Sequence, residues 1–168
     1  MYWIDDLKDA IPDYAKDTRL NLDLIKRTSL DPEVAEGCAL AAAFATGDTK
    51  TWTWLQSVME NKTESDAALT AASLMAQNNV WYPYNEMVDG ALDGLPAGLR
   101  MNAIASHGGT TQDRFEAYSL AASIIGKCHF CVKAHFETLK TAGYTLDQLK
   151  DIGRIAAVMN SACKVLVG

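Results

Sequence analysis

Apolar residues recur at helical spacing along almost the whole chain. Residues 5–29, 31–47, 64–82 and 145–168 each place apolar side chains three or four positions apart, as one face of a helix requires. No continuous run of β-branched residues, the usual mark of a buried strand, interrupts this pattern. The pattern therefore predicts an all-α protein, folded as a compact helical bundle.

Local start and stop signals agree with this pattern. Asp31 stands before Pro32, which is an N-cap followed by the residue favoured at the first helical position, and the same segment ends at Gly47. The Gly- and Asp-rich stretch "MVDGALDGLPAG" at 87–98 and the segment "SHGGTTQD" at 106–113 are the clearest predicted loops.

An internal similarity appears at an offset of 80 residues. The segment "EGCALAAAFATG" at 36–47 aligns with "EAYSLAASIIGK" at 116–127, with the same Glu, Leu, Ala and Ala at corresponding places. We predict a single domain over residues 1–168, built from two related helical units: a degenerate unit at about 36–80 and a catalytic unit at about 116–165. Chance similarity between Ala-rich segments is the alternative.

Length and charge exclude several classes of protein. The 168 residues suffice for one domain with a sizeable core, and the formal net charge of -6 argues against nucleic acid or an anionic membrane surface as a partner. The N-terminal "MYWIDDLKDAIPDY" carries acids where a signal peptide needs basic residues. No window reaches the roughly 18 consecutive apolar residues of a membrane span. We therefore expect a cytoplasmic protein.

The residues that could carry chemistry gather in "KCHFCVKAH" at 127–135, which holds two of the four cysteines and two of the three histidines. Cys128, Cys131 and His135 follow i, i+3 and i+4 spacings, so on a helix they share one face. A Cys-x-x-Cys pair at a helix start suits reversible disulfide formation, because the helix N-terminus stabilises a thiolate. His135 would be the base that takes the thiol proton.

Such a histidine needs a carboxylate to orient it and to compensate its charge. Glu116 is the candidate, because it lies at the head of the preceding helical segment and the break at Gly126 and Lys127 lets the two segments pack together. Lys127 also adds a positive charge beside Cys128. The alternative is that Glu116 is a solvated acid at a helix start, favoured there by the helix dipole.

Other interpretations of the cysteines and histidines stay open. A zinc site would need a fourth ligand such as Cys163 or His129, and no second Cys-x-x-Cys or His-x₃-His pair exists, so we expect no metal. Cys38 and Cys163 are expected to be small buried side chains. On a helix His129 points about 100° away from Cys128, which leaves it at most a secondary proton carrier. His107 is expected in an exposed loop.

Taken together, these residues resemble a known family. Glu116, followed twelve residues later by "CHFCVKAH", is similar to the pattern of the alkylhydroperoxidase D (AhpD) group of the carboxymuconolactone decarboxylase superfamily. The segments "IPDYAKDTRLNL", "NNVWY" and "GLRMN" also resemble AhpD segments, so the likeness covers nearly the whole chain. Phe130 is a departure, because well-known AhpD proteins have a histidine immediately before the second cysteine.

The resemblance implies an antioxidant thiol peroxidase that reduces alkyl and hydrogen peroxides. Carried over, Cys131 is the peroxidatic residue that becomes a sulfenic acid. Cys128 is the resolving residue, which protonates the leaving group and closes the Cys128–Cys131 disulfide. His135 and Glu116 form the proton relay. No bound metal, flavin or haem is implied.

The resemblance also implies partners and an assembly. Dihydrolipoyl groups on a 2-oxoacid dehydrogenase subunit are the expected external reductant, an AhpC-type peroxiredoxin is a further expected partner, and the expected assembly is a homotrimer. A non-redox, decarboxylase-like enzyme of the same superfamily is an alternative, although such members generally lack the cysteine pair. A zinc-stapled helical interaction module is the other alternative.

Overall fold

The structure is a computed structural model that describes residues 1–166. Its elements are α1 (Trp3–Ala10), the 3₁₀ helix η1 (Asp13–Ala15), α2 (Lys16–Asn21), α3 (Asp23–Lys26), α4 (Pro32–Thr46), α5 (Thr49–Val58), α6 (Lys62–Met87), α7 (Ala103–Ser106), the 3₁₀ helix η2 (His107–Gly109), α8 (Gln112–Gly126), α9 (His129–Thr141) and α10 (Leu146–Leu166). Residues 1–166 contain no strand. The predicted all-α fold is confirmed.

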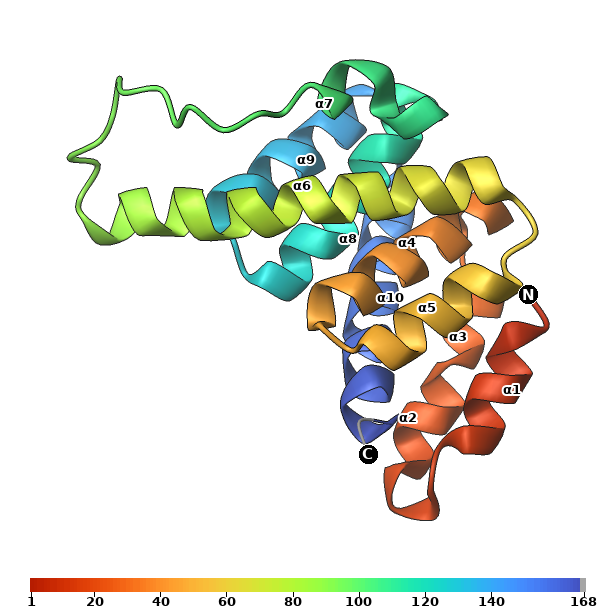
Figure 1. The fold of residues 1–168 in the computed structure, drawn as a ribbon. Coiled ribbons are helices and arrows are strands. Elements are labelled where there is room, and N and C mark those ends of the chain that lie inside the picture. The colour runs from red at the N-terminus through yellow and green to blue at the C-terminus, as the bar shows by residue number, and fades with distance from the viewer. Residues whose placement is uncertain (167–168) are drawn as a thin grey trace.

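Four helices form the centre of the bundle. Helices α4 and α8 pack against each other, and α6 and α10 each pack against both of them. Helix α9 lies against α8 and α6, while α2 and α3 contact α10 (Figure 1). The C-terminal half of α6 projects beyond the rest of the bundle, and residues 88–102 return from its end to α7 (Figure 1). No helix of the described chain is long and apolar enough to cross a membrane.

Small residues bring the central helices close together. A Cβ atom on Gly37 of α4 would lie 2.2 Å from Cε1 of Tyr118 on α8, so only glycine fits beneath this ring. Tyr118 is fully buried and donates its hydroxyl to Glu64 of α6. Arg114 donates to Glu64 at 2.9 Å and to Glu33 of α4 at 2.6 Å, and so links the two carboxylates. This polar network ties α4, α6 and α8 together, and the sequence pattern had not indicated it.

The predicted boundaries of α4 are confirmed. The side chain of Asp31 accepts from the backbone N–H of Glu33 at 2.9 Å, and Gly47 ends the helix with a left-handed φ of 84°. The N-terminal pattern at 5–29 is broken into shorter helices at Pro12. Proline has no N–H to donate and pushes the residue before it into the extended conformation that Ile11 adopts, with a ψ of 123°.

The two predicted loops have different outcomes. Residues 88–102 contain no helix, as expected for the 87–98 stretch, because α6 ends at Met87. The segment 106–113 is only partly a loop, because η2 and the start of α8 lie within it. His107 is half-buried, with its ring 5.9 Å from that of Phe115, and is therefore not the exposed residue that we expected.

The two segments related by the 80-residue offset end in the same way, and a helix follows each of them. Gly47 and Lys127 both take left-handed conformations, with φ values of 84° and 55°. The next residue caps the following helix in each case: the side chain of Asp48 accepts from the backbone N–H three residues later at 3.3 Å, and that of Cys128 does so at 3.2 Å. The duplicated unit itself stays a prediction.

Candidate active site

The cysteine pair lies at the N-terminus of α9. Cys128 is the N-cap and Cys131 lies in the first turn, where its backbone N–H donates to the Cys128 sulfur at 3.2 Å. The two residues are joined by a disulfide, with an S–S distance of 2.04 Å and a Cα–Cα distance of 5.3 Å. Both side chains are buried. The positive end of the helix dipole would stabilise a thiolate at either sulfur once the bond is reduced.

Glu116 and His135 meet between α8 and α9. The Oε2 atom of Glu116 lies 2.6 Å from Nδ1 of His135, and each side chain is about five-sixths buried, with 17% and 16% exposed. Helix α8 ends at Gly126, and the left-handed Lys127 turns the chain so that α9 packs back along α8. The structure thus brings the predicted carboxylate and imidazole together.

Glu116 also reaches solvent on its other side. It lines a cleft of about 480 Å³ together with polar side chains of α8 and α9, namely Gln112, Asp113, Thr138 and Thr141. Water in this cleft can exchange protons with the carboxylate, because the cleft opens to bulk solvent. The cysteine pair does not line it.

A residue that sequence reasoning missed completes the surroundings of the imidazole. The Nε2 atom of His135 lies 3.1 Å from Sδ of Met75, a buried residue of α6. Among residues 1–166, no hydrogen bond joins the His135 ring to Cys128 or Cys131 while the disulfide is closed. Met75 is one of many apolar residues in its helix, so nothing in the local sequence marks it as part of a site.

The remaining cysteines lie away from this cluster. Cys38 and Cys163 are free and buried, as predicted. Burial raises the pKa of Cys163 to about 11 and that of Cys38 further still. Cys163 lies beside Thr46 and Thr51 rather than beside the disulfide. Within the described part of the chain, no three His, Cys, Asp or Glu side chains are grouped to hold a metal ion.

Comparisons with known proteins identify the family of the chain. The carboxymuconolactone decarboxylase family matches residues 91–167, a region that contains Glu116 and the cysteine pair. An "Alkyl hydroperoxide reductase AhpD" of Mycolicibacterium paratuberculosis is 38% identical, covering 98% of this chain and 94% of its own length. The chain belongs to the AhpD family. Relatives with the same name from Mycobacteroides abscessus and Coxiella burnetii are 38% and 40% identical, each covering at least 94% of both chains.

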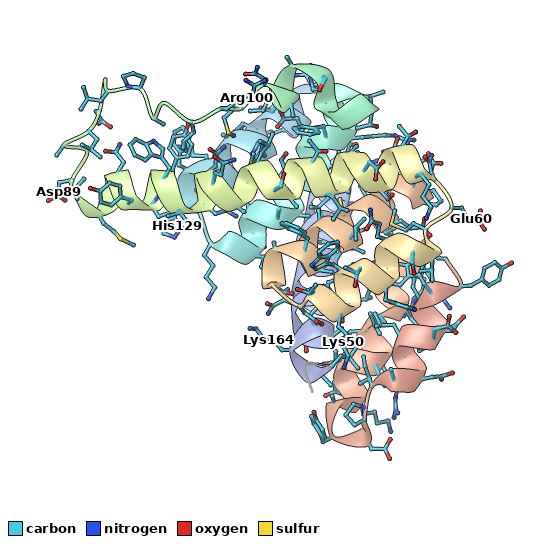
Figure 2. The ribbon with its side chains drawn as sticks, viewed as in Figure 1. Lys50, Glu60, Asp89, Arg100, His129 and Lys164 are labelled. Carbon is cyan, nitrogen blue, oxygen red and sulfur yellow. A yellow bond between two sulfur atoms is a disulfide. The ribbon has the colours of Figure 1, made fainter. Side chains whose placement is uncertain are left out.

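The departure from the AhpD pattern lies on the outer side of α9. Phe130 is 57% exposed and stacks on Tyr82 of α6 with a ring separation of 4.2 Å. His129 is 84% exposed, lies 3.8 Å from Glu86, and appears at the surface beside the C-terminal half of α6 (Figure 2). It is therefore not brought together with the cysteines. These aromatic and charged side chains line a surface cleft of about 520 Å³.

Proposed function

We propose that this protein is a thiol peroxidase that cycles between the Cys128–Cys131 dithiol and its disulfide. The observation that carries the proposal is the 2.6 Å contact between Glu116 and His135 on the helices that hold this disulfide. A buried carboxylate and imidazole beside a cysteine pair supply what a thiolate nucleophile needs, which is a base to take its proton. The AhpD relatives are named alkyl hydroperoxide reductases, which supports a hydroperoxide as the substrate.

In the first step the Cys131 thiolate attacks the outer oxygen of a hydroperoxide. The S–O bond forms as the O–O bond breaks, so the sulfur is oxidised to a sulfenic acid and the peroxide is reduced. The departing alkoxide takes the proton of the Cys128 thiol and leaves as an alcohol. His135, oriented by Glu116, takes the original proton of Cys131.

In the second step the Cys128 thiolate attacks the Cys131 sulfur. The S–S bond forms, the S–O bond breaks, and the hydroxide leaves as water with a proton drawn from solvent through the cleft that Glu116 lines, so the relay keeps the proton taken from Cys131. The 5.3 Å Cα–Cα distance lies within the range that a disulfide tolerates, which supports this closure. Rapid closure protects Cys131 from oxidation to sulfinic acid.

An external dithiol must then reduce the disulfide. We propose a dihydrolipoyl group on a 2-oxoacid dehydrogenase subunit as this donor, with an AhpC-type peroxiredoxin as a further partner in the cytoplasm. The cleft beside Phe130 supports this proposal, because the rings of Tyr82 and Phe130 give it an apolar wall. Within residues 1–166, this is the one part of α9 next to the disulfide that exposes aromatic surface.

We further propose that the protein assembles as a homotrimer. The projecting end of α6 and the segment 88–102 expose large apolar side chains that a monomer would leave in water, namely Val80, Tyr84, Met87, Leu95 and Leu99. Contact between copies would cover this surface. Sedimentation or light scattering measures the mass directly, and a monomeric mass at micromolar concentration would contradict the trimer.

Turnover assays with matched variants test the peroxidase. The protein, dihydrolipoamide and cumene hydroperoxide are mixed, and consumption of the peroxide is followed. We expect Cys131→Ser to abolish turnover, because no nucleophile remains, and Cys163→Ser to retain it, because that buried thiol lies beside Thr46 and Thr51. Full activity in Cys131→Ser would overturn the proposal. Repeating the assay with glutathione as donor tests the preference for a dithiol.

A further inference from the structure

The imidazole of His135 is held from both sides in the disulfide form. Its Nδ1 atom faces the Glu116 carboxylate at 2.6 Å and its Nε2 atom faces the Met75 thioether at 3.1 Å. Met75 is 1% exposed, so this sulfur has no access to water. The two contacts together restrict how many protons the ring and the carboxylate can share.

A thioether sulfur accepts a hydrogen bond weakly and has no hydrogen to donate. The 3.1 Å contact is therefore attractive only when Nε2 carries a proton that points at Sδ of Met75. The contact to Glu116 needs a second proton, placed either on Nδ1 or on the carboxylate. Whichever atom holds that second proton, the pair contains two protons, one more than a neutral imidazole beside a carboxylate ion.

We propose that Met75 is a positioning residue which keeps a proton on Nε2 of His135 while the disulfide is closed, and that this proton is delivered to Cys131 when the disulfide is reduced. The proposal rests on the dithiol cycle of the proposed function. It adds a residue and a proton state to that cycle: the oxidised enzyme already holds the proton that its reduction consumes.

The reduction step balances with this stored proton. A donor thiolate forms a bond to Sγ of Cys128, the Cys128–Cys131 bond breaks, and the electron pair passes to Sγ of Cys131, which takes the Nε2 proton. The second thiol of the donor then displaces Cys128, so that the donor ends as a disulfide. Of the two protons that the donor thiols lose, one protonates Cys128 and the other leaves to solvent, so His135 is again free to take the proton of Cys131 in the next cycle.

A weak acceptor suits this hand-over. Cys131 lies one helical turn before His135, so its released sulfur competes with Met75 for the same Nε2 proton. A thiolate is a far stronger acceptor than a thioether, so the proton moves to Cys131 once the bond opens. A carboxylate or a backbone carbonyl at the position of Met75 would hold the proton more tightly and oppose this transfer.

Charged groups on the neighbouring helices do not supply another partner. Among residues 1–166, Glu116 is the one ionisable side chain that is hydrogen-bonded or ion-paired to His135. The other charged side chains on α6, α8, α9 and α10 fall into two groups. Some contact other partners: Glu64 and Arg114 each other, Asp113 Tyr144, Glu86 His129, Asp147 Lys150, and Asp151 Arg154. The rest lie at the surface or in helix caps, namely Lys62, Asp66, Lys133, Glu137, Lys140 and Lys164.

The second half of the chain offers a matched control residue. Asn61 caps α6 and Thr145 caps α10 through the same contact to the backbone N–H three residues later, which sets an offset of 84 between these helices. At that offset Met75 corresponds to Met159, which is also fully buried. Met159 has no histidine partner among the described contacts. Met75→Leu and Met159→Leu therefore each remove a fully buried thioether, and each is a volume-conserving change of the kind that cores tolerate.

The test is a two-bond ¹H–¹⁵N correlation spectrum of the oxidised protein labelled with ¹⁵N-histidine, which reports the proton on each ring nitrogen. We expect the Nε2 proton of His135 to be present at pH 7 in the unmodified protein and in Met159→Leu, and to be lost at a lower pH in Met75→Leu. An unprotonated Nε2 in the oxidised protein at pH 7, or an unchanged pH dependence in Met75→Leu, would overturn the proposal.

A kinetic measurement accompanies the spectrum. Reduction of the disulfide by dithiothreitol is followed against pH, and we expect Met75→Leu to be slowed about threefold to tenfold at pH 7 with its profile shifted to lower pH. Met159→Leu should follow the unmodified protein. The spectrum reads the proton without peroxide, so a protein that fails to turn over peroxide but keeps the Nε2 proton would refute the peroxidase and not the role of Met75.

Discussion

Oε2 of Glu116 lies 2.6 Å from Nδ1 of His135, although the two residues are 19 positions apart on different helices. This contact orients the imidazole and gives it a negative partner when it becomes charged. It places an imidazole one helical turn from Cys131, in a region that excludes most water. The reactivity of the cysteine pair should therefore depend on a residue outside the Cys-x-x-Cys motif.

Removing the charge of Glu116 tests this dependence. We expect Glu116→Gln to lower kcat/KM for cumene hydroperoxide by about 10-fold to 100-fold, because the amide still contacts Nδ1 but no longer compensates an imidazolium. The matched control is Glu36→Gln, at the corresponding place 80 residues earlier, where the carboxylate accepts from Trp3 at 3.2 Å. A Glu116→Gln enzyme within about twofold of the unmodified rate would contradict the relay.

The close approach of α4 and α8 makes a stability prediction. Gly37→Ala forces a Cβ atom into the Tyr118 ring, which is fixed by its bond to Glu64, so we expect a loss of about 1–3 kcal/mol of unfolding free energy. Gly153→Ala in α10 is the control, because nothing lies within 4 Å of the added atom and alanine favours helix by up to about 1 kcal/mol. Urea denaturation measures both, and equal stabilities would show that Tyr118 moves freely.

The carboxyl of Asp151 gives the protein a predicted dependence on acid pH. Burial raises its pKa, but hydrogen bonds from Ser29, Thr28 and Arg154 more than offset this, so the pKa lies below the ordinary value of 3.8. Because the folded value is the lower one, the carboxylate stabilises the fold above about pH 4, and this stabilisation is lost as the pH falls through the folded value.

We therefore expect Asp151→Asn to be less stable at pH 7 by about 1–3 kcal/mol and to show a flatter loss of stability below about pH 4. Asp147→Asn, at a position where the side chain is 77% exposed, should keep the slope of the unmodified protein. Thermal unfolding followed by circular dichroism between pH 3 and pH 7 compares the three proteins. An unchanged slope in Asp151→Asn would assign the acid sensitivity to other carboxyls.

Thiol reactivity should separate the cysteines into two classes. At pH 8 a thiol with the pKa of about 11 given by burial to Cys163 is only about 0.1% thiolate, and Cys38 is less still. We expect no thiol of the native oxidised protein to react rapidly with Ellman's reagent. After reduction, two thiols should react rapidly, those of Cys128 and Cys131. The remaining two should react only after unfolding. Fast labelling of Cys163 in the folded protein would contradict this account.

Much of the fold could be predicted because its signals are local. Helical spacing, the Asp31–Pro32 start and the Gly47 end depend on residues within a few positions of one another, and the structure confirms each. The spacing of Cys128, Cys131 and His135 on α9 is local in the same sense. Pro12 was the missed local signal, because it divides a helical pattern that looks continuous from apolar residues alone.

The contacts between helices could not be predicted in this way. Met75 is 60 positions from His135, and the network of Glu33, Glu64 and Arg114 joins three helices. Such pairs depend on how helices cross, and a single sequence does not encode those angles in any short pattern. Glu116 could be predicted because a histidine that acts on a cysteine pair needs a carboxylate to orient it.

Trapping the oxidised sulfur tests the central claim most directly. Reduced Cys128→Ser protein is treated with cumene hydroperoxide in the presence of dimedone, and the modified residue is identified by peptide mass spectrometry. Without the resolving thiol, the account predicts a sulfenic acid adduct on Cys131, and no adduct in Cys131→Ser. An unmodified Cys131 in the first variant, or an adduct on Cys128 in the second, would contradict the assignment of Cys131 as the residue that attacks peroxide.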